Sequence, residues 1–249
     1  MKKYSFEQMM SLQGQVYRRL EGRSTERVIM DGESYFIKKH SGVGFKEIFK
    51  NLFQLRLPIL SAKNEKLALT LLKKLNIPSP EMIAYEKKGF NPAKIRSYIL
   101  TRELPKHTSL EHFCENWLEN PPHFSLKQSL IREVACIART MHANGMNHRD
   151  FYICHFLLDD KLWRASTIKL YLIDLHRACI RKCVPDRWLI KDLSGLYFSS
   201  KDIGLTKRDL LRFMKEYRNK SISQIFPEEL DFWRKVEQRG NKLYGQQKK

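Results

Sequence analysis

A chain of 249 residues with 42% hydrophobic and 11% aromatic residues is long and apolar enough to bury a core, which excludes an intrinsically disordered protein. The formal net charge of +19 predicts a partner of opposite charge, either nucleic acid, an anionic membrane surface or a multiply charged anionic substrate. The five cysteines are odd in number and scattered among apolar residues, which favours reduced thiols in the cytoplasm over a disulfide framework.

The apolar runs of the chain exclude two further classes of protein. The N-terminus lacks the apolar run of a signal peptide, and no later segment approaches the ~20 apolar residues of a membrane-spanning helix. We therefore expect a protein that is neither exported nor membrane-spanning. A metal site built from His176, Cys179 and Cys183 matches no common zinc spacing, so buried structural cysteines are favoured over it.

The first part of the chain predicts an antiparallel sheet. Strand patterns cover five short segments, at residues 16–20, 27–30, 34–38, 81–86 and 96–101. Asp31-Gly32, between the second and third of them, is a strong signal for a two-residue hairpin turn.

Two amphipathic helices are predicted between the third and fourth of these strands. The first, at residues 45–56, is basic; it either faces a membrane or packs on the sheet, and we favour the packing. The second follows Ser61 as N-cap and buries a stripe that includes Ala68 and Leu72. Glu65 lies at the edge of that stripe, where a carboxylate is costly unless a cation meets it.

Beyond a polar segment at residues 102–109 the pattern becomes mainly helical. A long amphipathic helix covers residues 126–141 and ends at Gly145. Thr206 and Asp209 have the spacing of a capping box at the start of a later helix. The chain as a whole therefore predicts an α+β fold.

Two acidic residues lie at special places in the second half. Strands predicted at residues 156–158 and 168–173, with a turn at 159–161, would pair as a hairpin. Asp150 lies in the loop before this hairpin, and Asp174 ends its second strand. Phosphoryl transfer needs such a pair, because one carboxylate orients and deprotonates the acceptor hydroxyl and another holds Mg²⁺ on the nucleotide phosphates.

Phosphoryl transfer also needs a cation on the phosphates. Lys38, at the end of a strand, is placed for this role, although its neighbour Lys39 is a rival. Glu65 on the following helix would be the ion-pair partner of this lysine, which resolves the cost of burying it. Each signal is weak alone, but the order of lysine, helix glutamate, His-Arg-Asp tripeptide and strand-end aspartate is specific for kinases.

Longer segments around these residues carry a family resemblance. They read NHRDFYICHFLL at residues 147–158, IDLHRA at 173–178 and KDLSGLYFSS at 191–200, with SYFIK at 34–38, KEI at 46–48 and NE at 64–65 in the first half. With these segments the chain resembles the lipopolysaccharide core heptose(I) kinases of Gram-negative bacteria, a family of the protein-kinase-like superfamily. The resemblance extends over nearly the whole chain.

The resemblance implies a bilobal protein-kinase-like α+β fold. In it, residues 1–102 form an N-lobe with an antiparallel sheet and helices, and residues 103–249 form a mainly helical C-lobe. It also implies ATP-dependent phosphorylation of a hydroxyl on the first heptose of the lipopolysaccharide inner core, with lipid A-Kdo-heptose as substrate. We expect a cytoplasmic enzyme, peripheral at the cytoplasmic face of the inner membrane, that uses ATP and Mg²⁺ and has no nucleic-acid partner.

The same resemblance assigns roles to individual residues. Asp150 is the catalytic base, Lys38 contacts the ATP phosphates, Glu65 is its ion-pair partner and Asp174 is a Mg²⁺ ligand. The net charge agrees with this substrate, because lipid A with its inner-core sugars carries several phosphates and carboxylates and lies in an anionic membrane.

Two departures from ordinary protein kinases affect the cofactor site. His155 stands where those kinases have a Mg²⁺-binding asparagine, so the second metal ligand is either His155 or water. The glycine-rich loop over the phosphates is reduced to Gly22. His148 and Arg149 are expected to pack the catalytic loop, and Asp192 is either the helix carboxylate that holds the backbone of this loop or a surface residue.

Three alternatives follow from the same observations. The net charge alone suggests a nucleic-acid-binding protein, but no zinc-finger spacing, RNP-like motif or basic heptad array supports it. His155 and the single Gly22 suggest a pseudokinase scaffold. Within the enzymes, a Kdo kinase or another small-molecule kinase of this fold is the nearest competitor.

Overall fold

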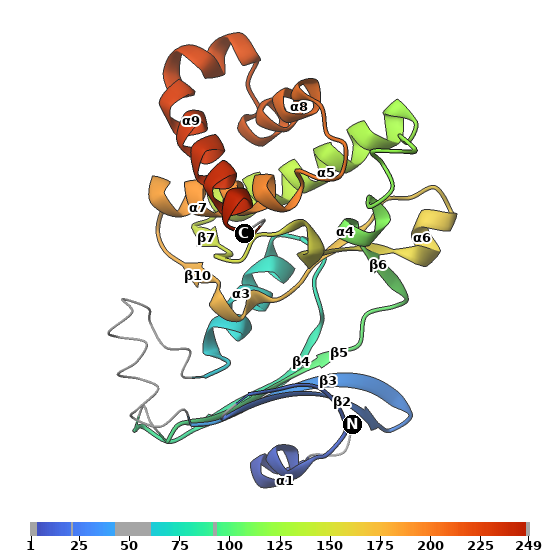
Figure 1. The fold of residues 1–249 in the computed structure, drawn as a ribbon. Coiled ribbons are helices and arrows are strands. Elements are labelled where there is room, and N and C mark those ends of the chain that lie inside the picture. Colours follow the sequence, from blue (N-terminus) through green and yellow to red (C-terminus); the bar gives the residue numbers. More distant parts are fainter. Residues whose placement is uncertain (1–3, 21, 43–60, 92–93, 248–249) are drawn as a thin grey trace. The chain divides into compact units, whose positions relative to one another are not determined.

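The computed structural model describes residues 4–20, 22–42, 61–91 and 94–247 (Figure 1). The helix expected at residues 45–56 lies outside these described residues. Contacts divide the chain into two compact units. The first unit comprises Met1–Thr70, Pro80–Leu104 and Leu175–Arg177, and the second comprises Leu71–Ser79, Pro105–Asp174 and Ala178–Lys249.

The first unit is built on a five-stranded antiparallel sheet. Its strand order is β1-β2-β3-β5-β4. The strands are β1 (Gln15–Leu20), β2 (Arg23–Met30), β3 (Glu33–Ser41), β4 (Met82–Lys88) and β5 (Arg96–Arg102). All five expected strands are present. The hairpin turn between β2 and β3 is confirmed as well, with both Asp31 and Gly32 at positive φ.

A helix that the sequence analysis missed covers one face of this sheet. Helix α1 (Phe6–Ser11) begins with a capping box, in which Ser5 and Gln8 bond to each other's backbone N–H groups. Its Phe6 and Met9 pack with alternate residues of the strands, which form the buried core of this unit. Helix α3 (Lys63–Lys74), which belongs to the first unit as far as Thr70, confirms the helix expected after Ser61.

The second unit is mainly helical, as expected. Its helices are α4 (Leu110–Phe113), α5 (Phe124–Ala143), α6 (Asp160–Arg164), α7 (Asp186–Ser199), α8 (Lys207–Arg218) and α9 (Ile222–Gln247), with short 3-10 turns at Ile153–His155 and, in the first unit, at Leu175–Arg177. Helix α8 packs on α5, and α9 packs on α7 (Figure 1). These contacts bury an apolar core between the helices.

Two small sheets complete this unit. Their strands are β6 (His107–Ser109), β7 (Met146–Asn147), β8 (Phe156–Asp159), β9 (Leu170–Leu172) and β10 (Cys179–Ile180), in the orders β6-β8-β9 and β10-β7. The expected hairpin is confirmed, since β8 pairs with β9. The turn expected at residues 159–161 is wrong, because Asp159 accepts hydrogen bonds from the Lys161 and Leu162 N–H groups and so starts helix α6 there.

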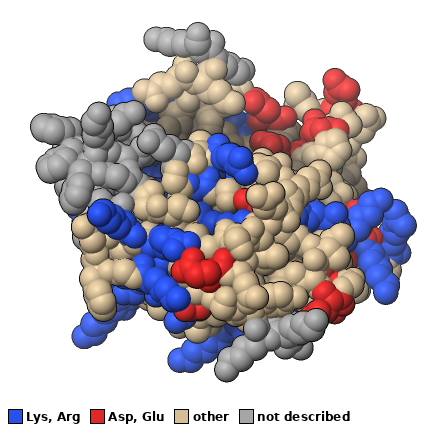
Figure 2. All heavy atoms as spheres, turned by 90° about the horizontal axis from the view of Figure 1, so that it is seen from below, with Lys and Arg blue, Asp and Glu red and all other residues tan. Residues whose placement is uncertain are grey.

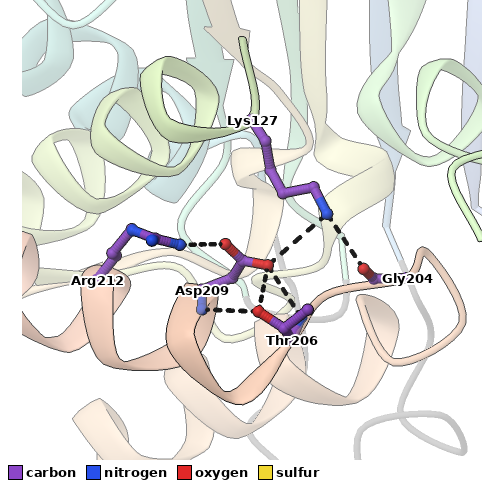
Figure 3. Close-up of polar contacts among 5 residues, drawn as sticks. All are labelled: Lys127, Gly204, Thr206, Asp209 and Arg212. Atoms are coloured by element: carbon purple, nitrogen blue, oxygen red, sulfur yellow. Dashed lines mark hydrogen bonds and ion pairs between the residues drawn. The ribbon is translucent and has the colours of Figure 1, made fainter. Parts of the chain in front are cut away.

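Helix α8 begins with the capping box expected from the sequence. Thr206 and Asp209 bond to each other's backbone N–H groups, and Arg212 donates to the same carboxylate at 2.7 Å (Figure 3). Lys127 of α5 reaches the Gly204 carbonyl at 3.2 Å and lies 3.7 Å from Asp209 (Figure 3). Burial raises the pKa of Asp209, but the Thr206 hydrogen bonds and Lys127 outweigh it and hold that pKa below its ordinary value. The capping carboxylate therefore also ties α8 to α5.

Gly145, at the end of α5, gives the first testable prediction. Its φ is 78°, and an added Cβ would lie 1.9 Å from the Arg181 carbonyl oxygen. We expect Gly145→Ala to lower the free energy of unfolding by about 2–4 kcal/mol, because left-handed backbone strain and a collision with backbone add up. Urea denaturation followed by circular dichroism measures this loss.

Gly245 provides a matched control for that substitution. It lies in α9, and an added Cβ there would meet no atom within 4 Å. Gly245→Ala should leave stability unchanged or raise it by up to about 1 kcal/mol, because alanine favours helix. Equal losses in the two variants would contradict the strain assigned to Gly145.

Candidate active site

A buried ion pair lies in the first unit. Lys38 Nζ of β3 lies 2.5 Å from Glu65 Oε1, in the first turn of α3, and Glu65 is only 5% exposed. The buried Glu65 carboxylate was expected to need a nearby cation, and Lys38 is that cation. His40 lies on the same face of β3, and burial, followed by the charges of Arg23 and Lys38, lowers its pKa to about 4, so it is neutral.

The rival lysine is on the opposite face of the sheet. Successive side chains of a strand alternate between faces, so Lys39 points to the face that α1 covers. There it lies 3.0 Å from Glu26 and donates to the Leu12 carbonyl at the end of α1. Lys39 thus stabilises the α1 face, and Lys38 is the lysine that meets Glu65.

Glu65 and Glu26 form a matched pair for a second prediction. Removing the carboxylate charge from Glu65 should release Lys38, so we expect Glu65→Gln to raise KM for ATP or lower kcat by about 10–100-fold, the effect of one charged hydrogen bond. Glu26→Gln removes the equivalent buried charge beside Lys39 on the other face. It should lower the melting temperature and leave the kinetic constants for ATP within about twofold. Similar kinetic losses in both variants would contradict the separate roles.

Gly22 forms part of a tight connection between β1 and β2. Leu20 pairs with Arg23, and Gly22 next to Arg23 has a φ of 69°. Its carbonyl accepts the Ser41 N–H at 2.8 Å. Such a short turn offers few backbone N–H groups to a phosphate, in agreement with the reduced glycine loop seen in the sequence.

In the second unit, a buried carboxylate holds the loop that contains Asp150. Asp192 of α7 has no exposed surface. The backbone N–H groups of His148 and Arg149 donate to its two oxygens at 2.6 and 2.8 Å. His142 of α5 donates a third hydrogen bond from Nε2 at 3.3 Å. Of the two roles considered for Asp192, the structural one is confirmed, and it fixes the backbone immediately before Asp150.

His148 connects this loop to the end of β9. Its Nε2–H donates to the Ile173 carbonyl at 2.9 Å, and the residue is buried. Burial lowers the pKa of His148 below its ordinary value, so the ring is neutral near pH 7. The expectation that His148 packs the loop against the strand ending at Asp174 is therefore confirmed.

His155 lies between the two acidic residues of the predicted site. Its Nδ1 is 2.7 Å from the Asp150 carbonyl oxygen, which can only accept, so Nδ1 carries the proton. On the other side of the ring, Nε2 lies 3.6 Å from Asp174 Oδ2. The ring also stacks on His148, at 5.7 Å and 17°. His155 is thus held with Nε2 next to the Asp174 carboxylate.

Asp174 has an uncommon backbone conformation. Its φ is 60°, and that of Arg149 is 77°. Left-handed conformations of residues other than glycine cluster at functional sites, where the surroundings enforce them. The Asp174 side chain is 31% exposed, so a ligand can reach its carboxylate. The backbone here is held in the conformation that presents this carboxylate beside His155.

Asp174 and His155 together fit a Mg²⁺ ion that keeps several of its water ligands. Such an ion is held in kinases by one or two carboxylates together with phosphate oxygens and waters, and a full protein cage is not required. Asp174 offers the carboxylate, and His155 Nε2 is a less suitable ligand than an oxygen atom. In the ranges that the structure describes, no three His, Cys, Asp or Glu residues gather to hold a metal, and this includes His176, Cys179 and Cys183.

Three residues that support the loop were missed in the sequence. Tyr217 of α8 lies 2.9 Å from His142 Nδ1, and burial raises the pKa of this phenol, so it keeps the proton that it donates. Ser199 of α7 accepts the Ile153 N–H at 2.9 Å. The sequence signal for the role of His142 is its position in the last turn of α5, in line with the apolar face of that helix. This signal is weak by itself.

Helices of the second unit also line an apolar cavity that is partly open to solvent. It has a volume of about 400 Å³ and is lined mainly by hydrophobic side chains of α5, α7, α8 and α9. Lys127 and Asp209, the pair shown in Figure 3, form a polar part of its wall. The cavity is large enough for an apolar ligand.

Comparison with known proteins decides the family. The sequence model of the lipopolysaccharide kinase (Kdo/WaaP) family matches residues 7–217. The chain belongs to this family. The resemblance found in the sequence is confirmed, and with it the kinase-like α+β fold and a phosphotransferase activity.

Individual members of the lipopolysaccharide kinase family are similar over nearly the full length. The lipopolysaccharide core heptose(I) kinase WaaP of Pseudomonas aeruginosa is 45% identical over 240 residues, which is 96% of this chain and 90% of that protein. The WaaP kinase of Escherichia coli K12 is 46% identical over 224 residues, which is 90% of this chain and 84% of that protein. A solved structure, WaaP in complex with acyl carrier protein, has a TM-score of 0.83 and 41% identity, and the match covers 96% of this chain and 92% of that one.

Proposed function

We propose that this chain is an ATP-dependent kinase that phosphorylates a hydroxyl on the first heptose of the lipopolysaccharide inner core. The observation that carries the proposal is the 45% identity to a core heptose(I) kinase over 96% of the chain. The held catalytic loop supports it, since Asp192, His148 and His155 all fix the backbone around Asp150.

The proposal assigns a catalytic role to residues of each unit. Asp150 accepts the proton of the heptose hydroxyl as that oxygen attacks the γ-phosphorus and the bond from this phosphorus to the leaving ADP breaks. Lys38, held by Glu65, stabilises the phosphate charge. Asp174, with His155 or water, holds Mg²⁺, which when bound neutralises charge on the phosphates.

The same proposal covers the glycine turn and the division of the chain. Gly22 offers its backbone N–H to the phosphates of ATP. Residues 1–102 and 103–249 are the N-lobe and C-lobe of the kinase.

The place of action is a further part of the proposal. A kinase of membrane-anchored sugars works from the cytoplasm at the anionic inner face of the membrane, and the net charge of +19 supports this. Figure 2 shows Lys and Arg side chains in several groups on one face of the molecule, with fewer Asp and Glu. In the described parts of the chain, no helix is long and apolar enough to cross a membrane.

An acyl carrier protein is a partner that the sequence analysis did not foresee. A structure 41% identical to this chain is of WaaP in complex with acyl carrier protein. We infer that this chain binds an acyl carrier protein too, and that the apolar cavity receives the acyl chain. Size-exclusion chromatography of the mixed proteins should show a complex with the acylated carrier. Separate elution of the two proteins at micromolar concentration would contradict this inference.

A labelled-phosphate assay tests the proposed activity. Purified protein is incubated with γ-labelled ATP, Mg²⁺ and core lipopolysaccharide that lacks heptose phosphate. We expect label in the glycolipid only when all three are present, and none when the acceptor is already phosphorylated on its first heptose. ATP hydrolysis without labelled glycolipid would contradict the proposal.

A further inference from the structure

Four cationic side chains surround one indole ring in the second unit. The guanidinium carbons of Arg149, Arg187 and Arg181 lie 4.4, 5.4 and 5.6 Å from the centroid of the Trp188 ring. Lys191 Nζ lies 5.5 Å from the same centroid. We call these four side chains and the indole the Trp188 cluster.

The Trp188 cluster is drawn from three separate segments. Trp188, Arg187 and Lys191 lie in the first turns of α7. Arg181 follows β10, and its Nη1 donates to Asn147 Oδ1 at 2.6 Å, which fixes its direction. Arg149 lies in the catalytic loop, with its backbone N–H held by Asp192. The side chains are therefore brought together by the fold and do not form one solvated helix face.

Such a gathering of like charges favours an anionic ligand. Each cation is attracted by the electron-rich face of the indole, but four cations around one ring also repel one another. The N-terminus of α7 adds a partial positive charge, since no side chain caps it there, although Asp186 at the first helical position offsets part of it. Arg187 is exposed and the other three cations are half-buried, so a ligand can reach them.

The position of the Trp188 cluster next to the proposed catalytic base indicates which anion it binds. Arg149 directly precedes Asp150, the residue that meets the heptose hydroxyl in the proposed function. In the acceptor, lipid A-Kdo-heptose, the sugar next to the first heptose is Kdo, an acid with a carboxylate, whereas the lipid A phosphates are farther away. Guanidinium groups bind carboxylates through paired, charge-assisted hydrogen bonds.

We propose that the Trp188 cluster binds the carboxylate of the Kdo sugar that carries the acceptor heptose. This inference rests on the proposed function and adds to it how the acceptor is selected. Binding this carboxylate places the neighbouring heptose over Asp150. A sugar chain without an acid at this position loses the contact and is a poor acceptor.

Arg187 is the residue to change in a test. It is exposed, and its contact is with Trp188, so its loss should leave the catalytic loop in place. We expect Arg187→Ala to raise KM for the heptose acceptor about tenfold, with kcat and KM for ATP within about twofold. Arg187→Lys should recover part of the loss. Lys161→Ala on the exposed side of α6 removes the same charge outside the Trp188 cluster, and should change none of these constants.

Two modified acceptors identify the anion. With acceptor whose carboxylates are converted to neutral methyl amides, wild type and Arg187→Ala should have equal KM. With acceptor whose lipid A phosphates are removed, the tenfold difference should persist. The proposal is overturned if the difference survives on the amide acceptor, if it disappears on the dephosphorylated one, or if Lys161→Ala has the same effect.

A binding measurement separates this inference from the proposed function. Equilibrium binding of the detergent-dispersed acceptor is measured without ATP, for wild type and Arg187→Ala. If the wild type transfers no phosphate to heptose, the proposed function fails. The Trp188 cluster is still supported if Arg187→Ala binds the acceptor more weakly than the wild type and this difference requires the acceptor carboxylates. Equal binding by both proteins would refute it.

Discussion

Replacing Asp150 with asparagine should lower kcat by about 10²–10⁴-fold, the usual contribution of a general base. Asparagine has the same shape but cannot accept the proton of the heptose hydroxyl. The loop should keep its geometry, because Asp192 holds the two preceding N–H groups and His155 bonds to the Asp150 carbonyl, not to its side chain. KM for ATP should therefore stay within about twofold. Initial rates with saturating acceptor measure the effect.

Asp231→Asn is the control for this substitution. Asp231 lies on α9 with a side chain that is 86% exposed, so its change to asparagine should affect neither rate nor melting temperature. Asp150→Asn should unfold at the same temperature as this control. An Asp150→Asn enzyme that keeps more than about a tenth of the wild-type kcat would show that the base is another residue.

Replacing Asp174 with asparagine should remove most of the Mg²⁺-dependent rate that we propose. The carboxylate charge is lost, and because a bound cation contributes several kcal/mol to the transition state, we expect kcat to fall by about 10²–10⁴-fold. Asparagine is the suitable replacement since Asp174 has a φ of 60°, and asparagine tolerates the left-handed conformation better than alanine. The backbone is thus preserved while the ligand is changed.

Metal binding itself distinguishes this effect from a general loss of activity. Binding of Mn²⁺ in the presence of ATP, followed by water-proton relaxation, should weaken in Asp174→Asn and remain unchanged in Asp231→Asn. ATP binding measured in EDTA should be equal in both variants. Unchanged Mn²⁺ binding by Asp174→Asn would mean that Asp174 is not a metal ligand.

Local patterns in the sequence predicted much of the fold. Asp31-Gly32 specified the β2–β3 hairpin because a two-residue turn of type I′ needs positive φ at both positions, which aspartate and glycine tolerate. The spacing of Thr206 and Asp209 specified the start of α8. Helix α1 was missed, since its six residues are stabilised by packing Phe6 and Met9 on the sheet, and a local pattern that short does not report such packing.

The sequence predicted those parts of the candidate site that depend on the order of motifs along the chain, such as the pairing of Lys38 with Glu65. The sequence left Lys39 as a rival of Lys38, and only the fold shows that Lys38 meets Glu65 of α3 on one face while Lys39 meets the end of α1 on the other. Asp192 and His142, which together support the catalytic loop, are 50 positions apart in the sequence, so no local pattern connects them. The Trp188 cluster likewise depends on contacts among three segments, and no single stretch of sequence contains it.

The position of the new phosphate tests the central claim most directly. The product of the reaction with ATP, Mg²⁺ and unphosphorylated core glycolipid is isolated, and tandem mass spectrometry with phosphorus NMR identifies the sugar that carries the phosphate. Our account predicts one phosphate ester on the first heptose and none on Kdo. Phosphate on Kdo, or a glycolipid that remains unmodified while ATP and the protein are intact, would contradict it.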